Sequence, residues 1–212
     1  SWFLLGEVIC RLASLDFSTA LRQLVLEPLG MTESFCGLTT DQFDLKKARL
    51  GKMFGRIPRG LDDLQWDLAE RVTSAAPGGN CRGPIYELGR LYESLLPGGE
   101  NSVLAETTCA ELVGRQRVGM FDETFRHQID WGFGFIVNSN CYGSETVPYG
   151  FGQYASESTF GHGGSQSSIG FADPENRIVV AWATNGRIGE PRHHERNRAL
   201  NEAIYRDLGL GS

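Results

Sequence analysis

The pattern of hydrophobic positions predicts two helices at the start of the chain. Residues Trp2 to Ala13 are apolar around most of a helix, which predicts a helix buried on several sides. Asp16 is a suitable N-cap for the next helix. That helix carries its apolar stripe at Phe17, Leu21, Leu24 and Val25. Pro28 and Gly30 should end it, because proline breaks a helix interior and glycine permits the turn.

The middle of the chain predicts three further helices. Residues 37–80 have a mixed pattern with a possible helix from Leu61 to Val72, and residues 74–83 form a loop rich in Gly, Pro and Asn. Pro84 is well placed to start a clear helix. The buried stripe of that helix is Leu88, Leu91, Tyr92 and Leu95. A shorter helix is expected from Glu106 to Val113.

The last third of the chain favours strands and then a closing helix. Trp131 to Asn138 is rich in aromatic and β-branched residues and predicts one strand, followed by a long polar loop over 139–157. Ser167–Ala172 and Arg177–Thr184 should be strands joined by a type I turn at 173–176. The helix from Arg192 to Leu208 should face inward with Leu200, Ala203, Ile204 and Leu208.

The order of these elements predicts an α+β fold. Helices come first, strands follow, and the βαβ alternation of a parallel sheet is missing. We expect the strands 131–137, 167–172 and 177–184 to lie in one antiparallel sheet, with the 192–208 helix packed on it.

Charge and composition exclude several function classes. The net charge of -6 and the pI of about 5.3 argue against a nucleic-acid partner. The five cysteines lack a C-x-x-C pair, so they indicate free or buried thiols and no disulfide framework. The four histidines lack helical zinc spacing, and we expect neither a metal nor a cofactor. No apolar run reaches the length of a transmembrane helix, and the start of the chain does not look like a signal peptide.

Widespread catalytic and phosphate-binding motifs are missing from the sequence. It contains no G-x-x-x-x-G-K-[ST] phosphate loop and no usable G-x-G-x-x-G. It also lacks G-x-S-x-G, because the run from Gly163 ends in Ser167, so an α/β-hydrolase elbow is not expected.

One glycine-rich stretch carries a specific resemblance. "FGHGGSQSSIGFADPE", within Thr159 to Arg177, resembles the third catalytic motif of the serine β-lactamase-like family, which has a Lys-Thr-Gly or His/Trp-x-Gly triplet on a strand. His162-Gly163-Gly164 matches the His form. The family includes class C β-lactamases, penicillin-binding-protein relatives, family VIII esterases and D-aminopeptidases.

Other segments resemble the same family in order and spacing. They are "WFLLGEVICRLASLDFSTALRQLVLEPLGM", "APGGNCRGPIYELGRLYESLLPGGENSVLAETT", "DWGFGFIV" and "IGFADPENRIVVAWATNG". The match covers nearly the whole chain, so it is informative about the family but not about the substrate. It implies an incomplete β-lactamase/transpeptidase-like fold, an antiparallel sheet flanked by helices.

The resemblance implies roles for four residues. The N–H of Ser165 would be one oxyanion-hole donor, and the N–H of the nucleophilic serine would be the other. His162 would donate a hydrogen bond near the leaving group or the polar end of the substrate. Gly163 and Gly164 would line the substrate site, since side chains there would block the backbone from the substrate.

Two of the family's three catalytic motifs are missing from these residues. Ser-x-x-Lys, which supplies the nucleophile and its base, does not occur, because Phe43, Asp44 and Arg49 stand three positions before the three lysines. Tyr92-Glu93-Ser94 fits the second motif formally, but Tyr92 falls on an apolar helix stripe and should belong to the core. We therefore expect residues 1–212 to be the C-terminal part of a single domain and to be inactive alone.

The resemblance implies a serine hydrolase acting through an acyl-serine intermediate, an esterase or a peptidase. Its partner would be a small ester, amide or peptide substrate. A true β-lactamase is less expected, because histidine is mostly neutral at pH 7 while the lysine it replaces is a fixed cation. A non-catalytic binding or regulatory paralogue is the other alternative, and the presence of Ser-x-x-Lys upstream decides between them.

Overall fold

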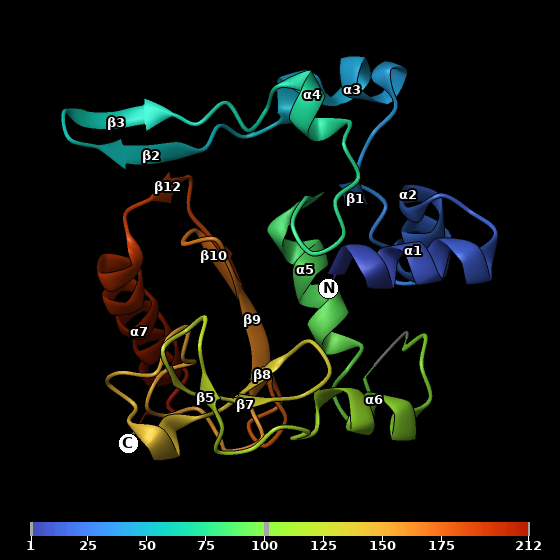
Figure 1. Ribbon diagram of the computed structural model, residues 1–212. Coiled ribbons are helices and arrows are strands. Elements are labelled where there is room, and N and C mark those ends of the chain that lie inside the picture. Colours follow the sequence, from blue (N-terminus) through green and yellow to red (C-terminus); the bar gives the residue numbers. More distant parts are fainter. Residues whose placement is uncertain (1, 100–101, 212) are drawn as a thin grey trace. The chain divides into compact units, whose positions relative to one another are not determined.

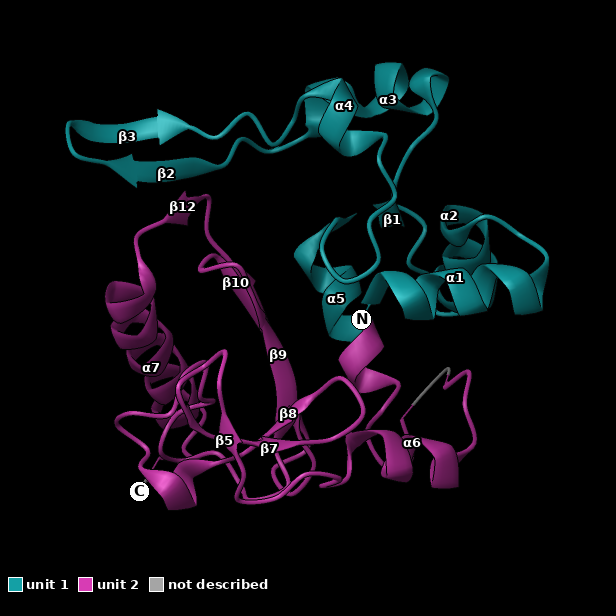
Figure 2. Cartoon of the chain, viewed as in Figure 1, with its two compact units in different colours: residues 1–90 teal, residues 91–212 magenta. Residues whose placement is uncertain are grey.

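The computed structural model describes residues 2–99 and 102–211. The chain divides into two compact units, residues 1–90 and residues 91–212 (Figure 2). Helix α5 (Ile85–Glu93) begins in the first unit and ends in the second. The two units are described separately.

The first unit opens as the sequence predicts. Helix α1 spans Trp2–Ala13, and the Asp16 side chain caps α2 (Phe17–Leu21) by accepting the N–H of Thr19. A π-helical turn (Arg22–Leu26) continues α2, and the chain then turns at Gly30, whose φ is +66°. The helix stop predicted from Pro28 and Gly30 is confirmed.

The predicted burial of α1 is wrong. Gly6 is the buried residue of this helix, whereas six large apolar side chains are substantially exposed. They are Trp2, Phe3, Leu4, Leu5, Val8 and Leu12. Leu12 is 83% exposed and Leu4 is 74% exposed. The hydrophobic pattern identified the helix correctly, but the described residues do not cover its apolar faces.

Residues 35–82 form short elements that the pattern only partly predicts. In chain order they are β1 (Phe35–Cys36), α3 (Thr40–Lys46), a 3₁₀ turn (Lys47–Arg49), β2 (Phe54–Ile57), β3 (Gly60–Asp63), α4 (Ala69–Val72) and β4 (Cys81–Arg82). Strands β2 and β3 pair as a hairpin, and β1 pairs with β4. The predicted helix over Leu61–Val72 is therefore wrong except for its last turn. Pro58 and Gly60 favour a tight turn, which turns the chain back into β3 instead.

A buried carboxylate joins α5 to the loop before β1. Glu87 is 1% exposed, and its carboxylate accepts hydrogen bonds from the N–H groups of Glu33 and Ser34 and from the Ser34 hydroxyl. These three donors satisfy a charge that would otherwise be costly to bury. The sequence pattern gave no sign of this contact.

The second unit is a five-stranded antiparallel sheet with helices. Its elements are α6 (Glu106–Val113), β5 (Phe121–Asp122), β6 (His127–Gln128), β7 (Asp130–Trp131), β8 (Ile136–Val137), a 3₁₀ turn (Asn140–Tyr142), β9 (Phe160–Gly164), β10 (Ser168–Asp173), β11 (Ile178–Ala183), β12 (Gly186–Arg187) and α7 (Glu190–Asp207). The sheet order is β11-β10-β9-β8-β7, and α7 runs alongside β9 and β10 (Figure 1). The α+β prediction and the predicted antiparallel sheet are confirmed.

The predicted single strand Trp131–Asn138 is a tight hairpin. Strand β7 ends at Trp131, β8 begins at Ile136, and the two pair antiparallel. The turn between them contains Gly134 with a φ of +87°, a conformation that favours glycine. The aromatic and β-branched residues do form strands, but Gly132 and Gly134 divide the run into two strands of the same sheet.

Helix α7 packs mainly through a polar face, and the predicted apolar face is confirmed only at Ile204. Its buried residues are His193, Asn197, Asn201 and Tyr205, spaced one helical turn apart. Of the residues expected to face inward, Ile204 packs against the core, Ala203 is exposed, and Leu200 and Leu208 are 39% and 55% exposed. Asn201 accepts a hydrogen bond from Trp182 Nε1 at 3.0 Å and donates one to the Gly150 carbonyl at 3.2 Å. Hydrogen bonds, and not leucine packing, therefore set the orientation of this helix.

Tyr205 links this helix to a buried carboxylate in the hairpin. The Tyr205 hydroxyl donates to Asp173 at 2.6 Å, and Ser156 and Asn176 donate to the same side chain. Burial raises the pKa of Asp173, but these hydrogen bonds outweigh it and lower the pKa to about 2. The turn predicted at 173–176 is thus fixed by its first residue.

Candidate active site

The His162-Gly163-Gly164 triplet forms the end of the central strand of the sheet. Strand β9 pairs with β10 in a register that sets His162 opposite Gly170 and Gly164 opposite Ser168. Between the strands, Ser165 and Gln166 take φ values of +31° and +62°, and the Ser167 N–H donates to the Gly164 carbonyl at 2.8 Å. The triplet therefore leads directly into a tight turn.

Two glycines of this stretch have a packing reason to be glycine. A Cβ on Gly161 would overlap the Gly170 carbonyl and Phe171, and a Cβ on Gly163 would overlap the ring of Tyr149. At Gly164 the nearest atom is Ser168 Oγ, the end of a side chain that can rotate away. Packing alone therefore explains Gly161 and Gly163, whereas Gly164 has no rigid neighbour that requires a glycine.

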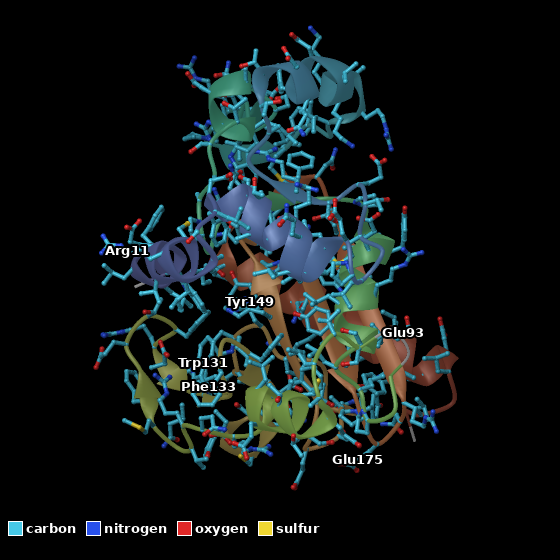
Figure 3. All side chains as sticks on the ribbon, turned by 90° about the vertical axis from the view of Figure 1, so that its right-hand side faces the viewer. Arg11, Glu93, Trp131, Phe133, Tyr149 and Glu175 are labelled. Carbon is cyan, nitrogen blue, oxygen red and sulfur yellow. The ribbon has the colours of Figure 1, made fainter. Side chains whose placement is uncertain are left out.

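His162 lies at the surface beside an aromatic cluster. Its side chain is exposed, and its Nδ1 lies 2.6 Å from the Gly163 carbonyl. The ring centroid of Trp131 lies 5.8 Å away, and Phe125 contacts both Trp131 and Tyr149 at 5.8 Å and 5.6 Å between centroids. Figure 3 labels Trp131 and Tyr149. His162 thus has one ring nitrogen occupied locally and an apolar wall at its side.

The Ser165 N–H is directed away from the interior of the turn. The Gly164–Ser165 peptide is trans, so its N–H and C=O point in opposite directions. The Gly164 carbonyl is held inside the turn by Ser167. Ser165 is itself exposed, and such an outward N–H is the type of donor that an oxyanion hole uses.

Helix α7 and the segment before it hold this turn in place. Gln166 Oε1 accepts the Gly189 N–H at 3.1 Å, and Gln166 Nε2 donates to Glu190 at 2.8 Å. The Gln166 carbonyl accepts from Arg196 at 2.8 Å, and the Ser165 carbonyl accepts from Arg187 Nε at 3.2 Å. Two hydrogen bonds to the Gln166 side chain and two to the Ser165 and Gln166 carbonyls therefore hold the turn, and we call these four contacts the Gln166 clamp. Sequence reasoning missed this clamp because its partners lie more than twenty residues away.

Tyr149 supports the motif from its other side. Its ring lies against Gly163, and its hydroxyl donates to the Glu190 carboxylate at 3.2 Å. Burial and the nearby Glu190 charge raise the pKa of Tyr149 to about 12. The hydroxyl therefore stays protonated, and Glu190 joins Tyr149 to the Gln166 clamp. The long polar loop 139–157 supplies this residue.

The described residues contain no second catalytic cluster that matches the missing motifs. Tyr92 is 4% exposed and packs against Phe135 and Phe160, which confirms its assignment to the core. A cavity of about 540 Å³ in the second unit lies beside Leu95, Cys109 and Phe160, and its lining does not include the residues from His162 to Ser165. No three His, Cys, Asp or Glu side chains in the described ranges gather as a metal site would require. None of the described helices is long and apolar enough to cross a membrane.

Comparisons with solved structures agree on the fold. A penicillin-binding protein homologue from Caulobacter crescentus is 24% identical with a TM-score of 0.61, and the alignment covers 94% of this chain and 56% of that one. A simvastatin synthase (LovD) variant from Aspergillus terreus is 18% identical with a TM-score of 0.76, over 97% and 55% of the two chains. EstCE1, described as a hydrolase with promiscuous acyltransferase activity, is 19% identical with a TM-score of 0.67, over 92% and 53%.

The chain spans little more than half the length of these solved relatives. At these identities the likeness shows the fold. A search of the curated proteins found no match. A comparison with protein-family models matches residues 1–204 to the family described as Beta-lactamase. The strand-borne triplet, the antiparallel sheet and this match over almost the whole chain lead to one conclusion: the chain belongs to the Beta-lactamase family.

Proposed function

We propose that this chain supplies one wall of the active site of a serine hydrolase, an esterase or peptidase that acts through an acyl-serine intermediate. The observation that supports this most is the exposed turn at Ser165, which follows the His162-Gly163-Gly164 triplet and is fixed by the Gln166 clamp. A rigid outward N–H beside a surface histidine suits the stabilisation of a developing oxyanion.

The nucleophile of this proposal lies outside these residues. Ser-x-x-Lys does not occur in the sequence, and the solved relatives are nearly twice as long as their matched part. We therefore place Ser-x-x-Lys and the tyrosine motif on a further segment of a longer protein. The serine there would attack the acyl carbonyl, while the lysine and tyrosine act as general base and acid.

In this arrangement each residue of the wall has a separate task. The N–H of Ser165 and that of the nucleophilic serine would bind the carbonyl oxygen as it gains negative charge. Gly164 leaves room for the substrate beside β9. His162 would donate a hydrogen bond to the leaving group or to the polar end of the substrate. The aromatic side chains near His162 suit an acyl group with apolar parts.

The test uses the full-length protein together with residues 1–212 alone. Both are treated with a fluorophosphonate probe, which labels activated serines, and assayed with a panel of p-nitrophenyl esters and a chromogenic cephalosporin. We expect the full-length protein to be labelled on its Ser-x-x-Lys serine and to hydrolyse esters, and residues 1–212 to do neither.

The other outcomes identify the alternatives. Faster turnover of the cephalosporin than of any ester would indicate a true β-lactamase. A full-length protein without labelling and without turnover of any substrate would contradict the proposal and favour a non-catalytic paralogue.

A further inference from the structure

Two of the five cysteines face each other across a pair of short strands in the first unit. Strands β1 and β4 pair antiparallel with Phe35 opposite Arg82 and Cys36 opposite Cys81. Directly opposed residues in an antiparallel pair lie ~4.5–5.5 Å apart between Cα atoms, with their side chains on the same face. A disulfide needs a Cα separation of ~4.4–6.8 Å, so this register meets the requirement without moving the strands.

The two thiols differ in solvent exposure and in the direction of their pKa shifts, a combination that suits thiol exchange. Cys36 is 3% exposed, whereas Cys81 is exposed to solvent. A hydrogen bond from the Cys81 thiol lowers the pKa of Cys36 to about 7, and the Arg82 charge acts in the same direction. The same interaction raises the pKa of Cys81. Cys36 is therefore the thiol that ionises more readily, and Cys81 is the one that a reagent can reach.

We propose that Cys36 and Cys81 are a redox modification site, at which a small disulfide of the glutathione type forms an intrachain disulfide. Both cysteines belong to the first unit, whereas His162 to Ser165 belong to the second, so this proposal does not depend on the proposed hydrolase activity. In the structure the two cysteines are not joined by a disulfide.

The reaction balances as two successive thiol–disulfide exchanges. Cys81 passes its proton to Cys36 as its sulfur attacks the small disulfide, which gives a mixed disulfide on Cys81 and releases one small thiolate. Cys36 then loses its proton to that thiolate and attacks the Cys81 sulfur, which releases the second small thiol after it takes a proton from water. The two cysteines are oxidised, and one small disulfide is reduced to two thiols.

The position of the pair gives the bond a structural consequence. Residues 37–80 of the first unit lie between these two cysteines in the chain and contain α3, the β2–β3 hairpin and α4. A disulfide between Cys36 and Cys81 would close this long segment into a loop. A cross-link that closes a long loop restricts the unfolded chain and so stabilises the folded state. Oxidation should therefore make the fold of residues 1–90 more resistant to heat.

The experiment treats the whole 212-residue chain with oxidised glutathione and maps its cysteine-containing peptides by mass spectrometry, with melting followed before and after. The variants are Cys81→Ser, whose side chain is exposed, and the control Cys141→Ser, an exposed cysteine of the second unit. We expect a Cys36–Cys81 linked peptide and a Tm rise of about 5–10 °C in the wild type and in Cys141→Ser, and neither in Cys81→Ser.

Two results would overturn the proposal. One is a glutathione adduct that persists on Cys81 in the wild type without the cross-link to Cys36. The other is a Tm rise in Cys81→Ser equal to that of the wild type. The peptide map is read in the wild type itself, so it decides the question even where a variant folds poorly.

Discussion

At Gly163 the backbone of β9 lies directly against the Tyr149 ring, and a methyl group there has no space. We expect Gly163→Ala to displace Tyr149 and its hydrogen bond to Glu190, and to lower the free energy of unfolding by about 1–3 kcal/mol. Urea denaturation measures this change. The control is Gly186→Ala, where no atom lies within 4 Å of an added Cβ. Equal stabilities of the two variants would contradict the packing described for Tyr149.

Single residues were predictable from sequence where their partners are close in the chain. Asp16 caps α2 through Thr19, three residues away, and Gly30 ends the same segment. Glu87 and Tyr149 were not predictable, because their partners lie more than forty residues away. A buried carboxylate or phenol has no sequence pattern of its own, and only the fold brings the donor and acceptor together.

At the scale of elements, α7 packs through asparagines and not leucines. Asn201 binds both Trp182 Nε1 and the Gly150 carbonyl in a buried position. We expect Asn201→Ala to leave these two groups unpaired and to lower the free energy of unfolding by about 2–3 kcal/mol. Leu200→Ala, at the neighbouring and largely exposed position, should cost less than about 0.5 kcal/mol. A larger loss of unfolding free energy in Leu200→Ala than in Asn201→Ala would contradict this packing and favour the leucine face expected from the sequence.

The same helix should make stability depend on pH through His193. Burial lowers the pKa of His193 to about 4, and the positive charge of Arg196 acts in the same direction while the Glu190 carboxylate opposes it. In the unfolded chain a histidine binds its proton near pH ~6.5. The unfolded state therefore binds more protons below that pH, so this contribution to stability is complete above pH ~6.5 and is lost as the pH falls toward 4.

A comparison of the wild type with His193→Gln isolates this effect. Glutamine does not titrate, so the difference in unfolding free energy between the two proteins should shrink by up to ~1.4 kcal/mol per pH unit between pH 6.5 and 4. Chemical denaturation at a series of pH values measures it. Parallel curves for the two proteins across this range would show that His193 is not held neutral by the fold.

Elements were predicted well in existence and less well in their faces and breaks. The bounds of α1 and α6 match the hydrophobic pattern, and the β10–β11 hairpin follows from its turn residues. The pattern failed at Trp131–Asn138, where two glycines divide one apolar run into two strands. It also failed over Leu61–Val72, where a tight turn favoured a hairpin over a helix. In each case local turn geometry outweighed side-chain character.

At the scale of the whole molecule, α1 carries several large exposed apolar side chains. Trp2, Phe3, Leu4 and Leu12 are each at least half exposed. We expect residues 1–212 to bind a hydrophobic dye such as ANS or to self-associate, because soluble proteins rarely expose such contiguous patches. Dye fluorescence and light scattering measure this. Leu4→Glu with Leu12→Glu should reduce both signals, and a monodisperse wild type without dye binding would contradict the exposure described here.

The candidate site was only partly visible in the sequence. The resemblance located His162, Gly163, Gly164 and Ser165, and the structure shows how they lie on β9 and in the following turn. It did not indicate the Gln166 clamp, which depends on α7 approaching the turn. The motif's residue types are therefore visible in the sequence, whereas the contacts that hold its backbone rigid appear only in the folded chain.

The measurement that tests the central claim most directly is the kcat/KM of His162→Ala in the full-length protein on its best ester substrate. The side chain is exposed, so its removal should leave Tm nearly unchanged. A lost hydrogen bond of the oxyanion-hole type predicts a decrease of about a hundredfold. His127→Ala, which removes a histidine of the β5–β6 hairpin, is the control and should keep full activity. Full activity of His162→Ala on every accepted substrate would show that His162 is structural and that His162 to Ser165 do not form a wall of the active site.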